Sequence, residues 1–318
     1  MYIGAFDIGG TKTIIALADE TGQILRKEQF VTDTRDCLKH LDVCCSLFRT
    51  FLEEEGIGTE QIRGIGVNLP GIVDRKRGIL LRAVYAGWYD VPVKEYLTEA
   101  LGIPDIVCEN DVNSCAVGEL VFGLGKQYRN FGWMTVSTGV GGAVVCDGRL
   151  VRGAHGYAGE FGHLKVDYEN PAKCPCGEEG CLEAHGSGTA LGRMIDKKVR
   201  EDASFREAFD RIKEKPTGAS CARLAKEGNE TALRIFEKAG EYLGKGISYY
   251  TNILDPEVMV VGGGVAASLD LLMPGIRKAL ERYTFAQMQD IKVLPTALGY
   301  EAALIGAIAI VLQENERV

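Results

Sequence analysis

The chain has 318 residues, of which 46% are hydrophobic and 25% are charged. These fractions are typical of globular proteins and exclude disorder as a description of the whole chain. At roughly 150 residues per domain, the length predicts two domains. The net charge of −8 disfavours a general nucleic-acid-binding protein, which needs Lys and Arg to neutralise phosphates, so we expect no nucleic-acid partner.

No segment of the sequence predicts a membrane span. The longest apolar run, Ala302–Leu312, is far shorter than the ~20 residues that a spanning helix needs. The first residues, Met1–Asp7, lack the basic start of a signal peptide and already include an acid. We therefore expect a cytoplasmic protein with no membrane partner, whose ten cysteines are reduced thiols rather than disulfides.

The first part of the chain alternates apolar runs with glycine-containing turns. These runs predict strands at Tyr2–Asp7, Thr13–Ala18, Gln23–Phe30, Ile62–Leu69 and Ile106–Cys108. Apolar residues at helical spacing predict helices at Asp36–Glu55, Val93–Leu101 and Val112–Phe122. Gly56 is the expected end of the first helix, because glycine readily adopts the left-handed conformation that terminates helices.

The opening pattern of strand, Gly/Thr turn, strand, acid-plus-Gly turn and strand then returns. It predicts strands at Phe131–Ser137, Ala143–Cys146 and Arg149–Arg152, about 130 residues after the first set. This weak internal repeat indicates two similar halves. We infer a smaller domain of residues 1–115 plus 299–318 with the first turn, and a larger domain of residues 116–298 with the second.

The rest of the larger domain is predicted to be mainly helical. The pattern predicts a charged helical region at Arg193–Gly240, helices at Asn229–Leu254 and Leu271–Tyr283, a buried strand at Glu257–Val261 and a buried closing helix at Ala302–Leu312.

The strongest chemical signal is one histidine followed by three clustered cysteines. His163 precedes Cys174, Cys176 and Cys181, and three thiolates with one imidazole form the ligand set of a closed, structural zinc site. Three unligated core cysteines are a poor alternative, because the loop around them is polar. A redox centre is a second alternative, although the Cys-x-Cys spacing differs from the usual Cys-x-x-Cys.

Two glycine-rich turns are candidate phosphate sites. Asp7 is followed by Gly9-Gly10-Thr11-Lys12, and the second turn contains Thr138-Gly139. Such turns after a strand can present backbone N–H groups to an anion, although the first alone is explained equally well by an ordinary hairpin. Asp7, at a strand end, is a candidate for holding Mg²⁺ through water.

The segment Glu109–Asn113 lies at a predicted strand-to-helix junction and has two interpretations. Asn110 or Asp111 can cap the following helix. Alternatively, the carboxylate accepts the proton of a sugar hydroxyl as that hydroxyl attacks a γ-phosphate. Both interpretations place a polar side chain at the end of the strand.

The run Gly262-Gly263-Gly264 follows the late buried strand. With Val265-Ala266-Ala267 it satisfies a Gly-x-Gly-x-x-Ala pattern, so a Rossmann dinucleotide fold is one interpretation. The pattern occurs late in the chain and Glu281 falls within a predicted helix. A loop that lets adenine and ribose approach the backbone agrees better with the two phosphate turns.

Together these motifs resemble the ROK family (repressors, open reading frames, kinases). The resemblance rests on the Asp7–Lys12 turn, Pro70-Gly71, Asn110–Asn113, the 138–142 turn, Gly159–His163, the cysteine loop and Gly262–Val265, in this order along the chain. It implies an α/β fold of the actin-like, ribonuclease-H-like type, with two domains and with the sugar and nucleotide in a central cleft. It further implies an ATP-dependent sugar kinase that uses Mg²⁺ and a structural Zn²⁺.

The resemblance also implies roles for individual residues. Asp111 matches the catalytic base. The residues that match sugar-binding positions are Gly71, Asn110, Asp111, Glu160, His163 and Glu183. The residues that match nucleotide-binding positions are Asp7, Gly9, Gly10, Thr11, Lys12, Thr138, Gly139, Gly262, Gly263 and Gly264. His163 is then both a zinc ligand and a sugar contact, because the metal fixes one ring nitrogen and aims the other.

The substrate expected first is glucose, phosphorylated at O6. The segment Arg82–Trp88 resembles the Asn-Leu-Gly-Trp stretch of glucokinases but has Tyr85-Ala86 in place of Asn-Leu, so N-acetylmannosamine, N-acetylglucosamine, allose, fructose and β-glucosides remain alternatives. The non-enzyme alternative is a sugar-sensing ROK regulator. Such regulators carry a winged helix-turn-helix before the first turn, and because that turn begins here at Asp7 we expect no such module. The resemblance also suggests a homodimer or homotetramer.

Overall fold

The protein divides into two compact units in the computed structural model, which describes residues 1–83 and 86–315. Unit 1 comprises Met1–Arg129, Gly148–Ala158 and Thr296–Val318, and unit 2 comprises Asn130–Asp147 and Gly159–Pro295. These boundaries differ from the inferred domains chiefly in residues 116–129 and 148–158. The physical reason for the first difference is that one helix, Asp111–Phe122, spans the expected boundary at 115/116 and packs as a whole within unit 1.

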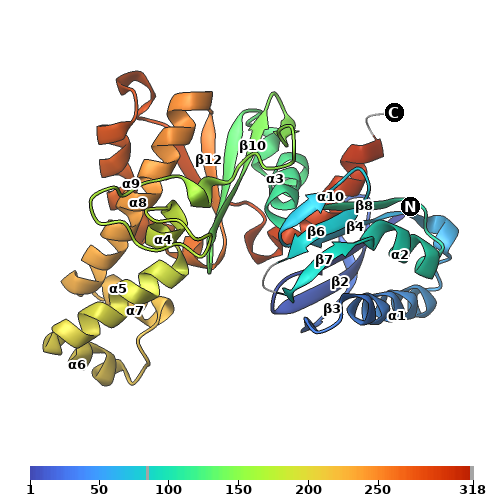
Figure 1. The fold of residues 1–318 in the computed structure, drawn as a ribbon, viewed down its shortest axis with the longest axis horizontal. Helices are drawn as coiled ribbons and strands as arrows, with labels where there is room; N and C mark the ends of the chain where they lie inside the picture. Colours follow the sequence, from blue (N-terminus) through green and yellow to red (C-terminus); the bar gives the residue numbers. More distant parts are fainter. Residues whose placement is uncertain (84–85, 316–318) are drawn as a thin grey trace. The chain divides into compact units, whose positions relative to one another are not determined.

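Unit 1 is built on a five-stranded sheet with the order β3-β2-β1-β4-β8 (Figure 1). Its strands are β1 Tyr2–Ile8, β2 Lys12–Asp19, β3 Ile24–Val31, β4 Ile62–Leu69 and β8 Ile106–Asn110. Strand β1 pairs parallel to β4, and β4 parallel to β8, whereas β2 and β3 are antiparallel. The predicted strands are confirmed, with end differences of one or two residues.

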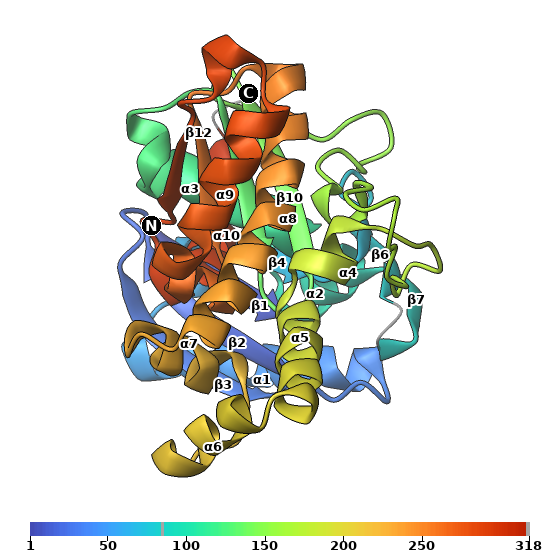
Figure 2. The same ribbon diagram turned by 90° about the vertical axis from the view of Figure 1, so that its left-hand side faces the viewer.

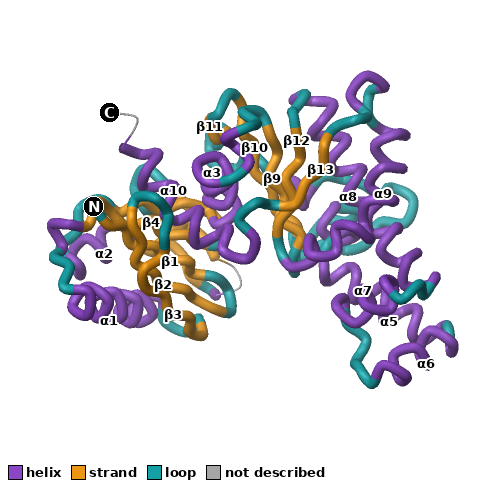
Figure 3. Tube along the Cα trace, turned by 180° about the vertical axis from the view of Figure 1, so that it is seen from behind, coloured by secondary structure: helices purple, strands orange, loops and turns teal. Residues whose placement is uncertain are grey.

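Helices cover both faces of this sheet, because its strands alternate apolar side chains between two cores. The helices of unit 1 are α1 Cys37–Glu55, α2 Val93–Leu101, α3 Asp111–Phe122 and α10 Ala302–Asn315. Phe6 and Ile8 of β1 pack in the core that contains α1 and α2, whereas Ile3 and Ala5 pack against α10. Figure 3 shows α10 beside the β1 and β4 strands. The alternation therefore directs Asp7 to the α10 face.

Helix α1 ends as predicted at Gly56, which has a φ of 65° and donates its N–H to Glu53 and Leu52 carbonyls. The predicted range of α2 is confirmed to the residue, and Gly102 ends it in the same left-handed conformation.

A small antiparallel sheet in unit 1 was not predicted. It consists of β5 Ile72–Asp74, β6 Ile79–Ala83 and β7 Trp88–Val91. Its strands are too short for a clear alternation of apolar and polar residues. Val84 and Tyr85, part of the segment compared with glucokinases, lie outside the described residues.

The second five-stranded sheet has the order β11-β10-β9-β12-β13, which repeats the strand order of the first. Its strands are β9 Phe131–Val136, β10 Val140–Cys146, β11 Arg149–Val151, β12 Val258–Gly262 and β13 Lys292–Pro295, with β11 supplied by the 148–158 segment. Antiparallel pairing of β9 with β10 and parallel pairing of β9 with β12 match the corresponding pairs of the first sheet. The predicted internal repeat is confirmed as a repeat of topology.

The helices of unit 2 pack against this sheet and against one another (Figure 2). They are α4 Leu182–Gly186, α5 Gly188–Glu201, α6 Ala203–Ile212, α7 Gly218–Lys226, α8 Glu230–Leu254 and α9 Leu269–Tyr283. Helices α8 and α9 lie side by side because they cross at glycines. A Cβ at Gly275 would lie 1.9 Å from the carbonyl oxygen of Glu237, so only glycine allows this approach.

Short 3₁₀ turns connect several of these elements, at Thr59–Gln61, Leu124–Lys126, Phe161–His163, Gly264–Ser268, Ala286–Met288 and Gly299–Glu301. Among the described residues, no helix has the length and apolar character needed to cross a bilayer.

Candidate active site

Three polar residues form a row across the parallel strands of unit 1. Asp7 on β1 is the register partner of Asn68 on β4, which in turn is the partner of Glu109 on β8. Because paired residues in a parallel sheet point to the same face, all three side chains lie on the α10 side. The Asn68 side-chain amide donates to the Ala303 carbonyl at 2.6 Å and to the Asp7 carboxylate at 3.3 Å.

The first glycine turn directly follows Asp7. The Gly9 N–H donates to the Lys12 carbonyl at 2.9 Å and closes the turn. Burial raises the pKa of the Asp7 carboxyl above its ordinary value, opposed by the hydrogen bond from Asn68 and by the charge of Lys12. A carboxylate beside a turn of backbone N–H groups fits a hard cation carried by a phosphate ligand.

Asn110 and Asp111 lie where β8 meets α3, and here the structure decides which residue caps the helix. Asn110 is the N-cap, and its side-chain oxygen accepts the N–H groups of Val112 at 3.0 Å and Asn113 at 3.2 Å. Asp111 occupies the first turn, with one carboxylate oxygen accepting the Val112 N–H at 3.0 Å. The capping role therefore belongs to Asn110 and leaves the interpretation of Asp111 as a base in place.

Gly71 lies next to this junction. The Asn110 side-chain amide donates to the Gly71 carbonyl at 3.1 Å. Gly71 has a φ of 107°, and a Cβ there would lie 2.2 Å from the Arg82 carbonyl oxygen. Glycine is therefore required at position 71 for its positive φ and for its close approach to the Arg82 backbone.

Glu109 is a residue that sequence reasoning did not single out beyond its place in the segment. It is 4% exposed, and one oxygen accepts the Asn110 N–H at 3.1 Å and the Asn113 side-chain amide at 3.2 Å. Its other oxygen lies 2.8 Å from Arg152 Nε and 3.2 Å from Arg75 Nε. This network of ion pairs around the buried Glu109 fixes the backbone from which the Asp111 side chain projects.

The second glycine turn, in unit 2, is held by the start of α5. The Ser137 N–H donates to the Gly139 carbonyl at 2.9 Å, and the Gly188 N–H donates to the Ser137 carbonyl at 2.7 Å. The Thr189 hydroxyl donates to the Thr138 carbonyl at 2.8 Å. The carbonyl groups of this turn are thus tied to α5.

Glu183 of α4 contacts the same turn. Its carboxylate accepts the Val140 N–H at 3.0 Å, and a Cβ on Gly139 would lie 2.3 Å from Glu183 Oε2. Glu183 supports the turn directly, which the sequence did not reveal. Gly162 brings the Glu160–His163 segment to the same place, since its own Cβ would lie 2.1 Å from the Val140 carbonyl oxygen.

The three glycines at the end of β12 and directly after it lie beside the second turn. Gly262 is the register partner of Thr135, and Gly263, with a φ of 90°, would place a Cβ 2.5 Å from the Val136 carbonyl oxygen. The sheet contains antiparallel strands β10 and β11, which a Rossmann fold does not have. The arrangement favours the second interpretation, a loop beside the second glycine-rich turn.

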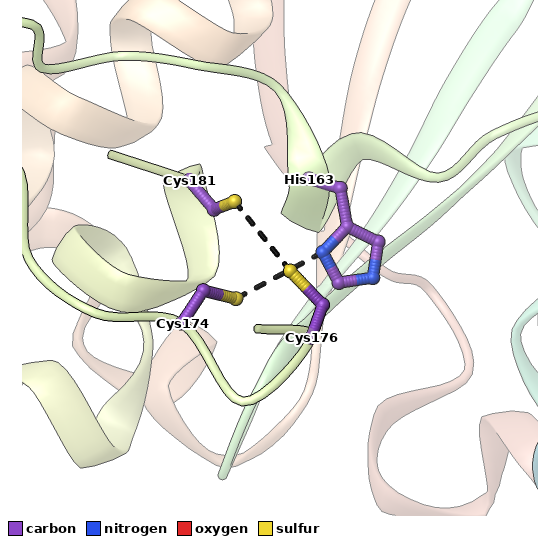
Figure 4. A group of neighbouring side chains, drawn as sticks. All are labelled: His163, Cys174, Cys176 and Cys181. Atoms are coloured by element: carbon purple, nitrogen blue, oxygen red, sulfur yellow. Dashed lines mark hydrogen bonds between the residues drawn. The ribbon is translucent and has the colours of Figure 1, made fainter. Parts of the chain in front are cut away.

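His163, Cys174, Cys176 and Cys181 converge in unit 2 (Figure 4). Their ligand atoms all lie within 4.8 Å of one another, with 3.9 Å between His163 Nδ1 and Cys174 Sγ and 3.8 Å between Cys176 Sγ and Cys181 Sγ. Tetrahedral zinc with bonds of about 2.3 Å holds neighbouring sulfurs about 3.8 Å apart. The donor set and its spacing therefore fit Zn²⁺.

The second nitrogen of His163 faces a carboxylate. His163 Nε2 lies 3.7 Å from Glu160 Oε2, and both side chains are exposed, at 43% and 62%. Because Nδ1 belongs to the cysteine cluster, Nε2 is the nitrogen left to face a ligand. Glu160 and His163 together present an acceptor and a donor to solvent.

The other cysteines are mostly buried. Burial raises the pKa of the Cys37 and Cys108 thiols to about 12, so neither is a ready thiolate. Cys44, Cys45, Cys115 and Cys221 are likewise buried, and Cys146 is half-buried.

The structure thus assembles the predicted residues in two groups. Unit 1 holds Asp7, the Gly9–Lys12 turn, Gly71, Asn110 and Asp111. The other group, in unit 2, consists of Thr138, Gly139, Glu160, His163, Glu183 and the Gly262–Gly264 loop.

Comparisons with known proteins match nearly the whole chain. The ROK family model matches residues 3–314. The glucokinase of Halalkalibacterium halodurans is 33% identical, covering 99% of this chain and 96% of the relative. The xylose repressor of Bacillus spizizenii is 27% identical, covering 98% of this chain and 77% of the repressor.

A solved structure agrees. The ROK family glucokinase of Streptomyces griseus, in complex with glucose and AMPPNP, superposes with a TM-score of 0.82 at 28% identity, covering 98% of this chain and all of that one. The two α/β units with repeated sheets accordingly have the actin-like ATPase fold of ROK sugar kinases. The chain is a member of the ROK family.

Proposed function

We propose that this chain is an ATP-dependent hexose kinase that transfers the γ-phosphate of ATP to O6 of glucose. One observation carries the proposal: Asp7 with the Gly9–Lys12 turn and the Asn110–Asp111 pair lie at the carboxyl ends of β1 and β8, two parallel strands of one sheet that are separated by β4. This edge offers an anion-binding turn and a carboxylate at a helix start, which are the groups that phosphoryl transfer needs.

Asp111 serves as the base in this proposal. Its carboxylate accepts the proton of the O6 hydroxyl while that oxygen attacks the γ-phosphorus and the bond to the β-phosphate oxygen breaks, which releases ADP. The Asn110 cap and the Glu109 network hold the strand end in place, so the carboxylate needs little reorganisation.

Sugar and nucleotide recognition are assigned to separate residues. Gly71, Asn110, Glu160, His163 and Glu183 are proposed to bind sugar hydroxyls, since carboxylates and amides that pair with hydroxyl groups reject analogues that lack one. Thr138 and Gly139 are proposed to bind phosphate, and the Gly262–Gly264 loop to lie against adenosine.

Two metal ions complete the proposal. His163, Cys174, Cys176 and Cys181 would hold a structural Zn²⁺, which stabilises the loop and orients His163. Asp7 would contact Mg²⁺ through water, and Mg²⁺ bound to ATP neutralises charge that develops on the phosphates. We further propose a homodimer or homotetramer in the cytoplasm, with no nucleic-acid or membrane partner.

A coupled ADP-release assay tests this function. Glucose, allose, fructose, N-acetylmannosamine, N-acetylglucosamine and a β-glucoside are each supplied with MgATP. Rapid turnover of glucose and slow turnover of the others is the expected result. If another sugar of the panel is preferred, that sugar replaces glucose as the proposed substrate, and the assignment as a kinase stands.

A sugar-sensing regulator is the second candidate, favoured by the similarity to a xylose repressor over 98% of the chain. It predicts tight sugar binding, measured by calorimetry, with no ADP release from any sugar. That combination of results would displace the kinase proposal.

A further inference from the structure

A continuous chain of buried hydrogen bonds leads from α1 to the first glycine turn. His40 Nε2 lies 2.8 Å from the Thr13 hydroxyl, which lies 2.9 Å from the Thr32 hydroxyl. The Thr32 hydroxyl donates to the Gly9 carbonyl at 2.8 Å. His40, Thr13 and Thr32 are 2%, 0% and 6% exposed, so water does not compete for these bonds. They come from α1, β2 and the segment after β3 (Figure 1).

The two ends of this chain of hydrogen bonds determine which group is the donor in each of them. The Asp33 backbone N–H donates to His40 Nδ1 at 3.3 Å, and an N–H group can only donate. Nδ1 is therefore the acceptor nitrogen, and His40 Nε2 carries the proton that it donates to Thr13. At the other end, a carbonyl can only accept, so Thr32 donates to Gly9 and accepts from Thr13. Neutral His40 in one tautomer satisfies all four groups.

The end of this chain aims one peptide group of the turn. The described residues contain no cis peptide bond, so the Gly9 carbonyl and the Gly10 N–H point in opposite directions. Thr32 holds the carbonyl on its own side of the peptide, so the Gly10 N–H points to the opposite side. The Gly9 N–H is already bonded to the Lys12 carbonyl. The Gly10 N–H is thus the donor whose direction is controlled by the chain of hydrogen bonds.

We propose that His40 is a positioning residue for phosphate binding, acting through Thr13 and Thr32 on the Gly9–Gly10 peptide. The inference rests on the proposed function, in which this turn binds the phosphates of ATP. It adds that the turn depends on a histidine in α1 that does not touch the nucleotide. The peptide groups of a glycine turn can otherwise rotate, because glycine adopts a wider range of backbone conformations than other residues.

The surroundings of His40 keep it in the required form. Its ring contacts Phe30 and Trp88, with ring centroids 5.5 and 6.0 Å away. Burial lowers the pKa of His40, against a smaller opposing effect of the Asp33 carboxylate. That carboxylate is itself paired with Arg35 at 2.7 Å.

Calorimetric titration of the full chain with Mg²⁺ and AMPPNP, and separately with AMP, tests the proposal. Thr32→Val keeps the shape of the side chain and His40→Phe keeps an aromatic ring, although a larger one, and each variant interrupts the chain of hydrogen bonds. We expect about tenfold weaker binding of AMPPNP for each, and AMP binding within twofold of wild type. Thr32→Ser retains the hydroxyl and restores AMPPNP affinity. In the kinase assay the KM for ATP rises about tenfold, with the KM for sugar unchanged.

Thr251→Val is the matched control. Thr251 is also buried and its hydroxyl donates at 2.8 Å to a carbonyl, that of Ile247, but it belongs to α8 of unit 2. This variant keeps the wild-type AMPPNP affinity. If Thr32→Val weakens the binding of AMPPNP and AMP equally, or weakens neither, the inference is overturned. The proposed function stands in that case as long as the wild-type protein phosphorylates sugar. A wild-type protein that binds no AMPPNP would overturn both.

Discussion

The Glu183 carboxylate accepts the Val140 backbone N–H at 3.0 Å, which ties α4 to the second glycine turn. Glu183 follows Cys181 in the cysteine loop by two residues and also matches a sugar-binding position of the family. One side chain therefore connects the candidate zinc loop, the candidate phosphate turn and the proposed sugar site. The loss of this carboxylate should affect both substrates.

Glu183→Ala is expected to raise the KM for sugar and the KM for ATP together, by about 10- to 100-fold each, because a hydrogen bond to a charged group is lost. Steady-state kinetics with each substrate varied in turn measures both constants. Glu179→Ala, in the exposed part of the same loop, is the control and should leave both unchanged. A change in only one of the two KM values would show that Glu183 acts on only one of the two substrates.

Glu109→Gln should destabilise unit 1. The variant leaves the half-buried Arg75 and Arg152 beside a neutral group, and loss of hydrogen bonds between charged groups costs about 1.5–3 kcal/mol. The free energy of unfolding in urea measures the loss. Glu230→Gln breaks an exposed i,i+4 pair with Arg234 and should change stability by less than ~0.5 kcal/mol. Equal stability of the two variants would contradict the structural role of Glu109.

The cysteine cluster should bind one zinc ion per chain by elemental analysis. Cys174→Ser and Cys181→Ser are expected to lose the metal and to lower thermal stability, because a structural zinc site contributes directly to folding. Cys146→Ser, outside the cluster, should retain the metal. Wild-type protein that folds without metal and with three reactive thiols would rule out the zinc site.

Stability should fall as the pH is lowered from 6.5 toward 5. Burial lowers the pKa of His40 and of His185, whose Nε2 accepts the Ala172 N–H, below the ordinary value of 6.5. The unfolded chain therefore binds protons at these two sites before the folded chain does, and stability is lost as pH falls. Carboxylates whose pKa is lowered by folding, such as that of Asp202, change the stability only below about pH 4. Their effect therefore lies outside the pH range of the two histidines.

Urea unfolding of the His40→Gln, His185→Gln double variant checks the origin of this slope. Each substitution removes a proton-binding site, so the double variant should show a flatter dependence between pH 5 and pH 6.5. A wild-type slope in the double variant would assign the effect to other groups.

Much of the fold followed from local patterns. The turn chemistry around Asp7–Lys12 and around residues 138–142, flanked by apolar runs, predicted a repeat that the two identical strand orders confirm. Gly56 and Gly102 end helices for a reason visible in the sequence, since glycine adopts the left-handed conformation at little cost.

The features that could not be predicted from the sequence are contacts between residues that lie far apart in the chain. Glu109 resembles any acidic residue until Arg75 and Arg152 are seen beside it. His40 occupies the core face of an amphipathic helix, and nothing local indicates its contact with Thr13. The strands of the small sheet, such as β5 Ile72–Asp74, are held by pairing across turns rather than by their own periodicity.

The central claim is that Asp111 accepts the proton of the attacking sugar hydroxyl. Asp111→Asn removes the base but leaves the helix cap, which belongs to Asn110, so the fold and sugar affinity should persist. We expect kcat to fall by about 10²- to 10⁴-fold, with sugar binding by calorimetry within a few-fold of wild type. Near-wild-type turnover by Asp111→Asn would contradict the account.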